Sequence, residues 1–132
     1  TLMRSSAASD VYKRQVYMYE NGALTWDAPC VTGNVSKNYT TPEGIYSLTY
    51  KQTDRVLRGT KQADGTYEYE SHVDYWMPFN GGIGFHDASW RSKFGGTIYQ
   101  YSGSHGCINL PVDKAKLLYE KVYKGMPVLC HN

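Results

Sequence analysis

Hydrophobic and polar positions alternate over short runs along much of the chain, and turn-forming residues separate these runs. Alternation with a period of two is typical of strands that bury one face. The first run, residues 16–19, is followed by Asn21-Gly22, a strong signal for a two-residue hairpin turn. Residues 51–75 are polar and contain a further hairpin signal at Asp64-Gly65. Further strand-like or apolar runs cover residues 23–26, 30–33, 45–50, 66–69, 75–79, 83–86 and 127–129.

One segment has helical periodicity. Between residues 112 and 124, apolar side chains recur three and four positions apart, which places them on one face of a helix: Ala115, Leu118, Tyr119, Val122 and Tyr123. Pro111 suits a first helical position, and Gly125 suits the position just after a helix ends. The pattern therefore predicts one mostly β domain with a late helix packed on the sheet.

The composition agrees with a single β-rich domain. The chain has 132 residues, the usual size of one domain, and its 13 Tyr and 13 Gly favour strands and turns. A net charge of +2 without a cluster of Lys and Arg argues against a nucleic-acid partner. No run approaches the roughly 18–20 apolar residues that a membrane-spanning helix needs.

Residues 1–15 differ from the rest of the chain. They are small and polar, without a sustained period, and no apolar segment follows their basic residues, so they are not an intact signal peptide. They resemble translated sequencing-adaptor read-through, and a flexible natural linker is the alternative. We therefore expect a non-native or disordered leader over residues 1–15 and a single domain over residues 16–132. If the leader is an artefact, the natural protein continues upstream.

The glycine-rich segment 85–110 gathers residues suited to nucleophilic catalysis. His86 precedes Cys107 by 21 positions, and His105 precedes it by two. A thiol on a tight turn of small residues is accessible to substrate, and nearby backbone N–H groups can face a developing oxyanion. An imidazole that takes the thiol proton makes it a useful nucleophile. An isolated cysteine is most often a small buried hydrophobic residue, but both histidines lying in this one stretch favour a catalytic site.

The order of these residues is specific. His86, a spacer of 17 residues and then Ser104-His105-Gly106-Cys107-Ile108-Asn109 resemble the signature of the L,D-transpeptidase catalytic domain, the YkuD-type family. Thr41-Pro42-Glu43-Gly44 resembles the family's Thr-Pro-x-Gly turn, and the resemblance covers about residues 15 to 132. It implies a YkuD-like, mainly antiparallel β sandwich with a helix after the active-site loop.

The resemblance also implies roles by position. Cys107 would be the acylated nucleophile, and His86 would be the general base that deprotonates it and later protonates the leaving amine. Asp87 would orient His86 through its backbone carbonyl, and its carboxylate could also contribute. Candidates for the wall of the cleft are Tyr75, Trp76 and Trp90, of which we expect two to belong to the core.

The loop around the nucleophile would complete the site. Ser104 and His105 would line it. The backbone N–H groups of His105, Gly106 and Cys107 would form the oxyanion hole, and Asn109 would hold the loop. The resemblance implies no cofactor and no metal.

The implied reaction is acyl transfer between the peptide stems of bacterial peptidoglycan. Cys107 attacks the carbonyl that joins the third residue of a tetrapeptide stem to D-Ala, D-Ala leaves, and a thioester remains. The side-chain amine of a second stem's diamino acid then attacks, giving a 3→3 cross-link, and an imidazole can take the amine proton. The resemblance also implies acylation by carbapenem β-lactams. The substrate places the protein outside the cytoplasmic membrane, associated with membrane or wall through an export signal or anchor that this chain lacks.

Other interpretations compete with transpeptidation. Water in place of the amine makes the same site an L,D-carboxypeptidase, and a degenerate copy would be a non-catalytic wall-binding module. Cell-wall cysteine peptidases usually place Cys before His, the reverse of the order found here.

The remaining metal-ligating and thiol side chains suggest two weaker alternatives. A zinc site would draw its ligands from His72, His86, His105 and Cys107. However, the Cys-x-x-Cys or His-x-x-x-His pairs that commonly fix such a site are absent. Cys30 and Cys130 are expected as separate buried thiols, with a disulfide between them as the alternative.

Overall fold

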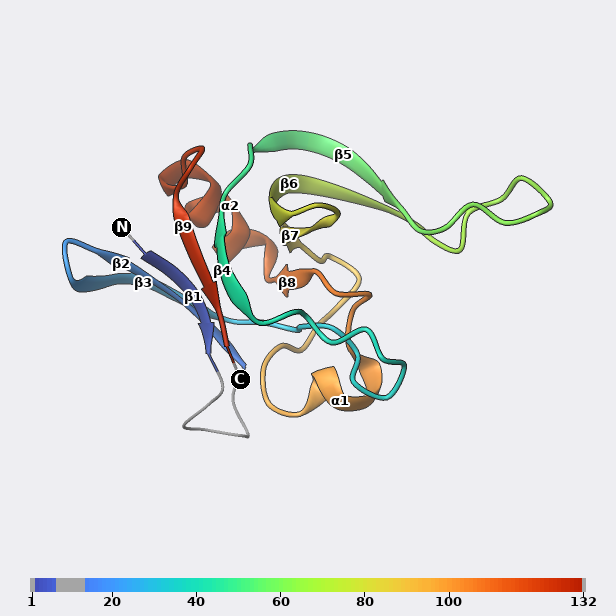
Figure 1. Ribbon diagram of the computed structural model, residues 1–132, viewed down its shortest axis with the longest axis horizontal. Helices are drawn as coiled ribbons and strands as arrows, with labels where there is room; N and C mark the ends of the chain where they lie inside the picture. The colour runs from blue at the N-terminus through green and yellow to red at the C-terminus, as the bar shows by residue number, and fades with distance from the viewer. Residues whose placement is uncertain (1, 7–13, 132) are drawn as a thin grey trace.

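The computed structural model describes residues 2–6 and 14–131 and folds them into two β-sheets and two helices (Figure 1). The first sheet has the strand order β3-β2-β1-β9-β4, and the second has the order β5-β6-β7-β8. The first sheet consists of β1 (Leu2–Ser6), β2 (Gln15–Glu20), β3 (Ala23–Pro29), β4 (Gly44–Ser47) and β9 (Pro127–Cys130). The second consists of β5 (Gln52–Arg58), β6 (Glu70–Asn80), β7 (Ile83–Asp87) and β8 (Ile108–Leu110). The helices are α1 (Ile98–Ser102) and α2 (Val112–Lys121), so the predicted mainly β class with a late helix is confirmed.

The strand pairs are antiparallel except for β1–β9 and β7–β8. In the β7–β8 pair, Phe85 lies opposite Ile108 and His86 lies opposite Asn109. Parallel neighbours need a long crossover rather than a hairpin. The crossover between these two strands contains α1 and the glycine-rich loop, so the pair brings His86 close to the end of that loop.

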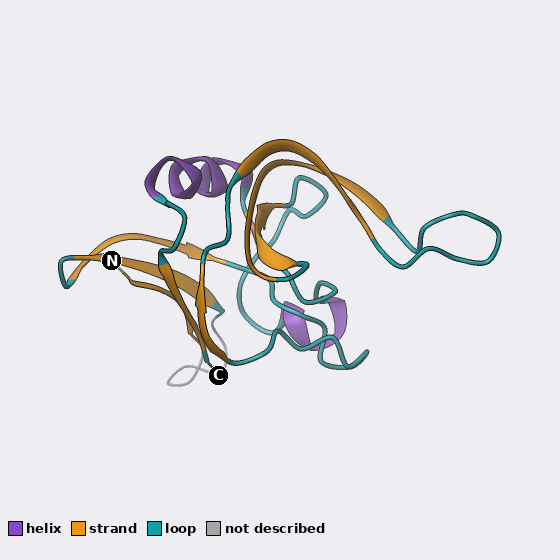
Figure 2. Cartoon of the chain, turned by 45° about the horizontal axis from the view of Figure 1, so that its top comes forward, coloured by secondary structure: helices purple, strands orange, loops and turns teal. Residues whose placement is uncertain are grey.

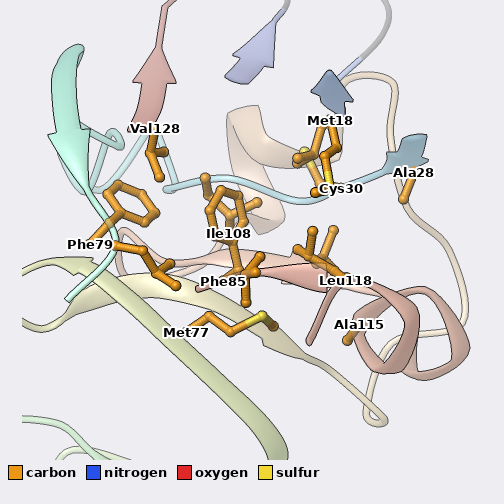
Figure 3. Close-up of a cluster of buried hydrophobic side chains, with 14 of the residues drawn as sticks. Met18, Ala28, Cys30, Met77, Phe79, Phe85, Ile108, Ala115, Leu118 and Val128 are labelled. Carbon is orange, nitrogen blue, oxygen red and sulfur yellow. The ribbon is translucent and has the colours of Figure 1, made fainter. Parts of the chain in front are cut away.

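The hydrophobic core lies between the two sheets and under α2. Figure 3 shows side chains of Met18 and Val128 from the first sheet meeting Met77, Phe85 and Ile108 from the second. Helix α2 packs against β6 and β7 through its buried residues Ala115 and Leu118. Burial of these side chains holds the two sheets together, and Figure 2 shows the strands of both sheets in orange.

Local signals predicted several elements correctly. The Asn21-Gly22 turn joins β2 to β3 with positive φ angles of 51° and 81°, as a tight hairpin turn requires. The predicted helix over 112–124 begins at Val112 but ends at Lys121. Val122 is already extended and its side chain is buried, because the chain turns there toward β9 and the core.

The polar stretch 51–75 forms a long hairpin of β5 and the first half of β6, with the predicted turn at Asp64-Gly65, and it extends away from the body of the molecule (Figure 1). Its side chains are mostly exposed, so it has little hydrophobic alternation to detect. The strand expected over 66–69 is wrong, because these residues belong to the hairpin loop. The run 30–33 forms only isolated bridges, Val31 to Asn109 and Gly33 to Ser104.

The first residues differ from the expectation of a leader outside the fold. Leu2–Ser6 form β1, which pairs with β2 and β9, and Gln15 begins β2. Residues 7–13 lie outside the described residues. The non-native origin of this segment stays a prediction. Neither helix of the described part of the chain has the length and apolarity needed to cross a membrane.

Substituting two adjacent leucines of α2, one buried and one exposed, tests how this helix packs on the core. Leu118→Ala is expected to lower the free energy of unfolding by about 2–5 kcal/mol, because the removed methyl groups leave a cavity against β6 and β7. Leu117 is 46% exposed on the same helix. Leu117→Ala should therefore change stability by less than about 0.5 kcal/mol. Urea denaturation of both variants measures the difference, and equal effects would contradict this packing.

Candidate active site

An open cleft with about 590 Å³ of empty space lies between the β5–β6 hairpin and the crossover from β7 to β8. Five of the residues predicted for the site line it: His86, Ser104, His105, Cys107 and Asn109. Asp87 and Gly106 are buried, and they are the sequence neighbours of His86 and Cys107. The structure therefore brings the predicted group together from both ends of the crossover.

The loop before β8 is held by hydrogen bonds that the spacing alone does not reveal. The Ser104 hydroxyl donates to the carbonyl of Cys107 and accepts the N–H of Gly106 at 3.1 Å. Gly106 has a φ of 127°, a backbone conformation that favours glycine. From the turn over residues 41–44, which precedes β4, the Thr41 hydroxyl donates to the carbonyl of Gly106 at 2.7 Å and accepts the N–H of Gly33 at 2.9 Å. Thr41 thus ties the loop to a segment 65 residues away.

His86 is oriented by the backbone of its neighbour. Its Nδ1 lies 2.7 Å from the carbonyl oxygen of Asp87. Because a carbonyl only accepts, Nδ1 carries the proton and the lone pair of Nε2 is available. The ring lies between Trp76 and Trp90, with centroid distances of 6.0 and 5.9 Å.

Burial keeps this imidazole neutral. Desolvation lowers the pKa of His86, and the positive charge of Arg91 adds to this, while the carbonyl and the charge of Asp87 oppose it. The net effect is a pKa below the usual 6.5. His86 is therefore in its basic form at neutral pH.

The carboxylate of Asp87 is bound by the backbone of β6. It accepts the backbone N–H groups of Asp74 at 3.0 Å and Tyr75 at 2.8 Å. The backbone pairing of β6 with β7 ends at Trp76 opposite His86, so these bonds continue the connection where the strands diverge. Asp87 therefore acts on His86 through its carbonyl and on the base of the hairpin through its side chain.

Cys107 is half-buried, and its thiol is protonated at neutral pH. The Sγ donates to the carbonyl of Gly82 at 3.3 Å. Burial raises the pKa of the Cys107 thiol to about 11, although the N–H of Gly84 opposes this. The resting pair is thus a neutral thiol and a neutral imidazole rather than a thiolate and an imidazolium.

Two of the three predicted oxyanion-hole donors are available. The Gly106 N–H is bound to Ser104, whereas no acceptor among residues 2–6 and 14–131 binds the N–H of His105 or Cys107. Asn109 holds the loop through its backbone, which exchanges two hydrogen bonds with Val31. Its side-chain Oδ1 is buried at the cleft and has no hydrogen-bond partner in the described part of the structure.

His105 connects the loop to the hairpin. Its ring lies between those of Tyr39 and Tyr69, with centroid distances of 4.8 and 4.4 Å. Its Nε2 is 3.7 Å from Oε1 of Glu68, to which the Tyr39 hydroxyl also donates at 3.4 Å. Sequence analysis missed Tyr39, Glu68 and Tyr69, because they come from two remote polar segments without a motif.

The aromatic residues and the other Cys and His have distinct places. Trp76 is buried and Tyr75 packs against the core, whereas Trp90 is half-exposed and lines the cleft, as expected for two core residues of three.

His72 is exposed on the hairpin beside Asp54. No three His, Cys, Asp or Glu side chains are grouped to hold a metal ion in the described residues. The two other cysteines are buried free thiols in the core: Cys30 and Cys130.

Comparisons with known proteins agree with this arrangement. The family described as the L,D-transpeptidase catalytic domain, YkuD, matches residues 8–130. A structure of the Ldtfm–avibactam carbamoyl enzyme is 35% identical with a TM-score of 0.86, covering 100% of this chain and 49% of that chain. This chain therefore spans about half the length of that protein. No curated protein matches the chain.

Two NMR structures from Enterococcus faecium are also similar. The L,D-transpeptidase catalytic domain is 35% identical with a TM-score of 0.80, covering 99% of this chain and 96% of that chain. The same domain acylated by ertapenem is 39% identical with a TM-score of 0.74, covering 89% of this chain and 88% of that chain. With the family match over nearly all residues, these likenesses show that the chain belongs to the L,D-transpeptidase catalytic-domain family, YkuD.

Proposed function

We propose that this protein is a peptidoglycan L,D-transpeptidase that transfers an acyl group through a thioester on Cys107. The observation that carries the proposal is the cleft itself. A carbonyl-oriented neutral imidazole and a thiol on a tight loop with two unengaged N–H groups open into one cavity. This is the set of groups that acyl transfer by a nucleophile requires.

In the first half-reaction, Sγ of Cys107 attacks the carbonyl carbon between the third residue of a tetrapeptide stem and D-Ala. The thiol is protonated at rest, so Nε2 of His86 takes its proton as the S–C bond forms. The N–H groups of His105 and Cys107 bind the developing oxyanion. His86 then gives the proton to the nitrogen of D-Ala, the C–N bond breaks, and a thioester remains.

In the second half-reaction, the side-chain amine of another stem attacks the thioester carbonyl. His86 takes a proton from that amine and gives it to Sγ as the C–S bond breaks, so Cys107 leaves as the thiol. The product is a 3→3 cross-link. If water attacks instead, the same steps release a tripeptide stem, which is the L,D-carboxypeptidase alternative.

A neutral resting pair suits this mechanism. Charging either group in the buried site would cost desolvation free energy, so the proton moves only when the substrate carbonyl is in place. General acid–base catalysis of this kind contributes roughly 10²- to 10⁴-fold to the rate. Because the proposed substrate is the cell wall, the protein would act outside the cytoplasmic membrane.

Intact-protein mass spectrometry with a carbapenem tests the nucleophile. The wild type should gain one drug mass, and Cys107→Ala should gain none, because Sγ of Cys107 is the proposed acyl acceptor. Cys130→Ala, which removes a core thiol and leaves the cleft intact, is the matched control and should still be acylated. A folded wild type without an adduct would favour the non-catalytic binding module. Incubation with a tetrapeptide stem and an amine then separates cross-linking from hydrolysis.

The pH dependence of carbapenem acylation tests the base. The rate should fall as pH decreases through the pKa of His86, with a midpoint below 6.5, because only the neutral imidazole accepts the thiol proton. The charges facing His86 are those of Asp87 and Arg91, which act in opposite directions. Since the pKa of the Cys107 thiol is about 11, no second inflection is expected near neutral pH. A rate that does not fall with decreasing pH anywhere in the range in which the protein stays folded would contradict His86 as the base.

Thr41→Val tests the tie between the turn and the loop. The variant keeps the side-chain shape but loses the bonds to Gly106 and Gly33, so we expect acylation of Cys107 to slow by about 3- to 10-fold. The neighbouring Thr40 is exposed, and Thr40→Val should leave the rate unchanged. Stopped-flow acylation kinetics with both variants, at matched melting temperature, give the comparison. Equal rates for the two variants would show that the tie does not matter for reactivity.

A further inference from the structure

One guanidinium in the cleft has no acidic partner. Arg91 follows β7 in the crossover and lines the same cavity as His86 and Cys107. Its Nη1 donates to the carbonyl of Ser102 at 2.8 Å. Across residues 2–6 and 14–131, no carboxylate oxygen lies within 4.0 Å of this guanidinium. Its Nε is shielded from solvent and has no hydrogen-bond partner there.

This arrangement differs from that of an arginine on the hairpin. Arg58 is half-exposed and pairs with Glu70 at 3.8 Å. Arg91, by contrast, keeps a charge in a partly desolvated position, where an unpaired donor costs free energy that an acceptor on a ligand would recover. The guanidinium remains protonated in proteins, and its planar fork matches a carboxylate.

We propose that Arg91 binds the α-carboxylate of the residue that leaves the acyl donor. This inference rests on the proposed function, because it assigns a contact to its donor. In that donor the carboxylate is attached to the carbon that bears the leaving nitrogen. Arg91 and His86 line the same cleft. A carboxylate held by Arg91 would therefore keep the leaving nitrogen in the cleft that contains the proposed proton donor.

The contact would also select the donor by length. A stem that ends at its fourth residue presents a free carboxylate at this point, whereas a longer stem presents a neutral amide. An amide cannot form the charge-assisted pair with a guanidinium. Arg91 would thus favour tetrapeptide over pentapeptide donors. A carboxylate on the third residue is a second source of the same chemistry, and the test separates the two.

The test measures kcat/KM for D-Ala release from the free-acid tetrapeptide and for alaninamide release from its C-terminal amide. The measurement is repeated with a free-acid tetrapeptide whose third residue is amidated. The wild type should prefer the free acid over the C-terminal amide by about 10- to 100-fold, as expected for a charge-assisted hydrogen bond. Arg91→Gln should abolish this preference by slowing the free acid alone, and Arg91→Lys should retain part of it. Lys93→Gln removes an exposed charge from the same loop and should keep the full preference.

Each other outcome has a defined meaning. If Arg91 only holds the loop through Ser102, Arg91→Gln will slow both donors equally, which overturns the inference. Sensitivity to amidation of the third residue instead would overturn the assignment to the leaving residue. If the wild type turns over no donor, the proposed function fails. In that case the role of Arg91 is tested separately, by the rates at which a carbapenem and its methyl ester acylate Cys107. Equal acid-to-ester rate ratios in wild type and Arg91→Gln would exclude carboxylate binding by Arg91.

Discussion

Strands β7 and β8 run parallel at the edge of the second sheet, with Phe85 opposite Ile108 and His86 opposite Asn109. Both Phe85 and Ile108 are fully buried between the sheets, so the hydrophobic core holds the register of the pair. Parallel strands cannot be joined by a tight turn. The chain must therefore cross over, and this crossover contains Trp90, Arg91 and the loop that ends in Cys107. The cleft and its reactive groups follow from this one pairing.

The same burial that stabilises the core controls the protonation of the site. Desolvation lowers the pKa of His86 and raises that of Cys107, so both groups are neutral before substrate binds. The Asp87 carbonyl selects one tautomer of the neutral imidazole, with the proton on Nδ1 and the lone pair on Nε2. The carboxylate of Asp87 does not compete for this proton, because it is engaged by two N–H groups of β6. Asp87 thus orients His86 through its carbonyl and binds β6 through its carboxylate.

Segments on two sides support the loop that ends in Cys107. From the segment that follows β3, Val31 pairs with Asn109, and Thr41 binds the loop at Gly106. From the other side, the β5–β6 hairpin contacts His105 through Tyr69 and Glu68. In the proposed acyl transfer, rigid support of this kind would hold the thiol and the N–H donors in place without a reorganisation cost. The hairpin itself is mostly exposed, so its contact with His105 links a peripheral element to the centre of the cleft.

The sequence by itself determined the groups that are defined by their own side chains or by short-range geometry. These include the segment that carries Cys107 and His86, the turn at Asn21-Gly22 and the helix that begins at Val112. Only the tertiary structure decided the parallel β7–β8 pair, the tie from Thr41 and the contact of the hairpin with His105. The physical reason is that those features depend on contacts between segments far apart in the chain, often through backbone carbonyl and N–H groups. Every residue carries such groups, so they leave no signal in the identity or spacing of the side chains.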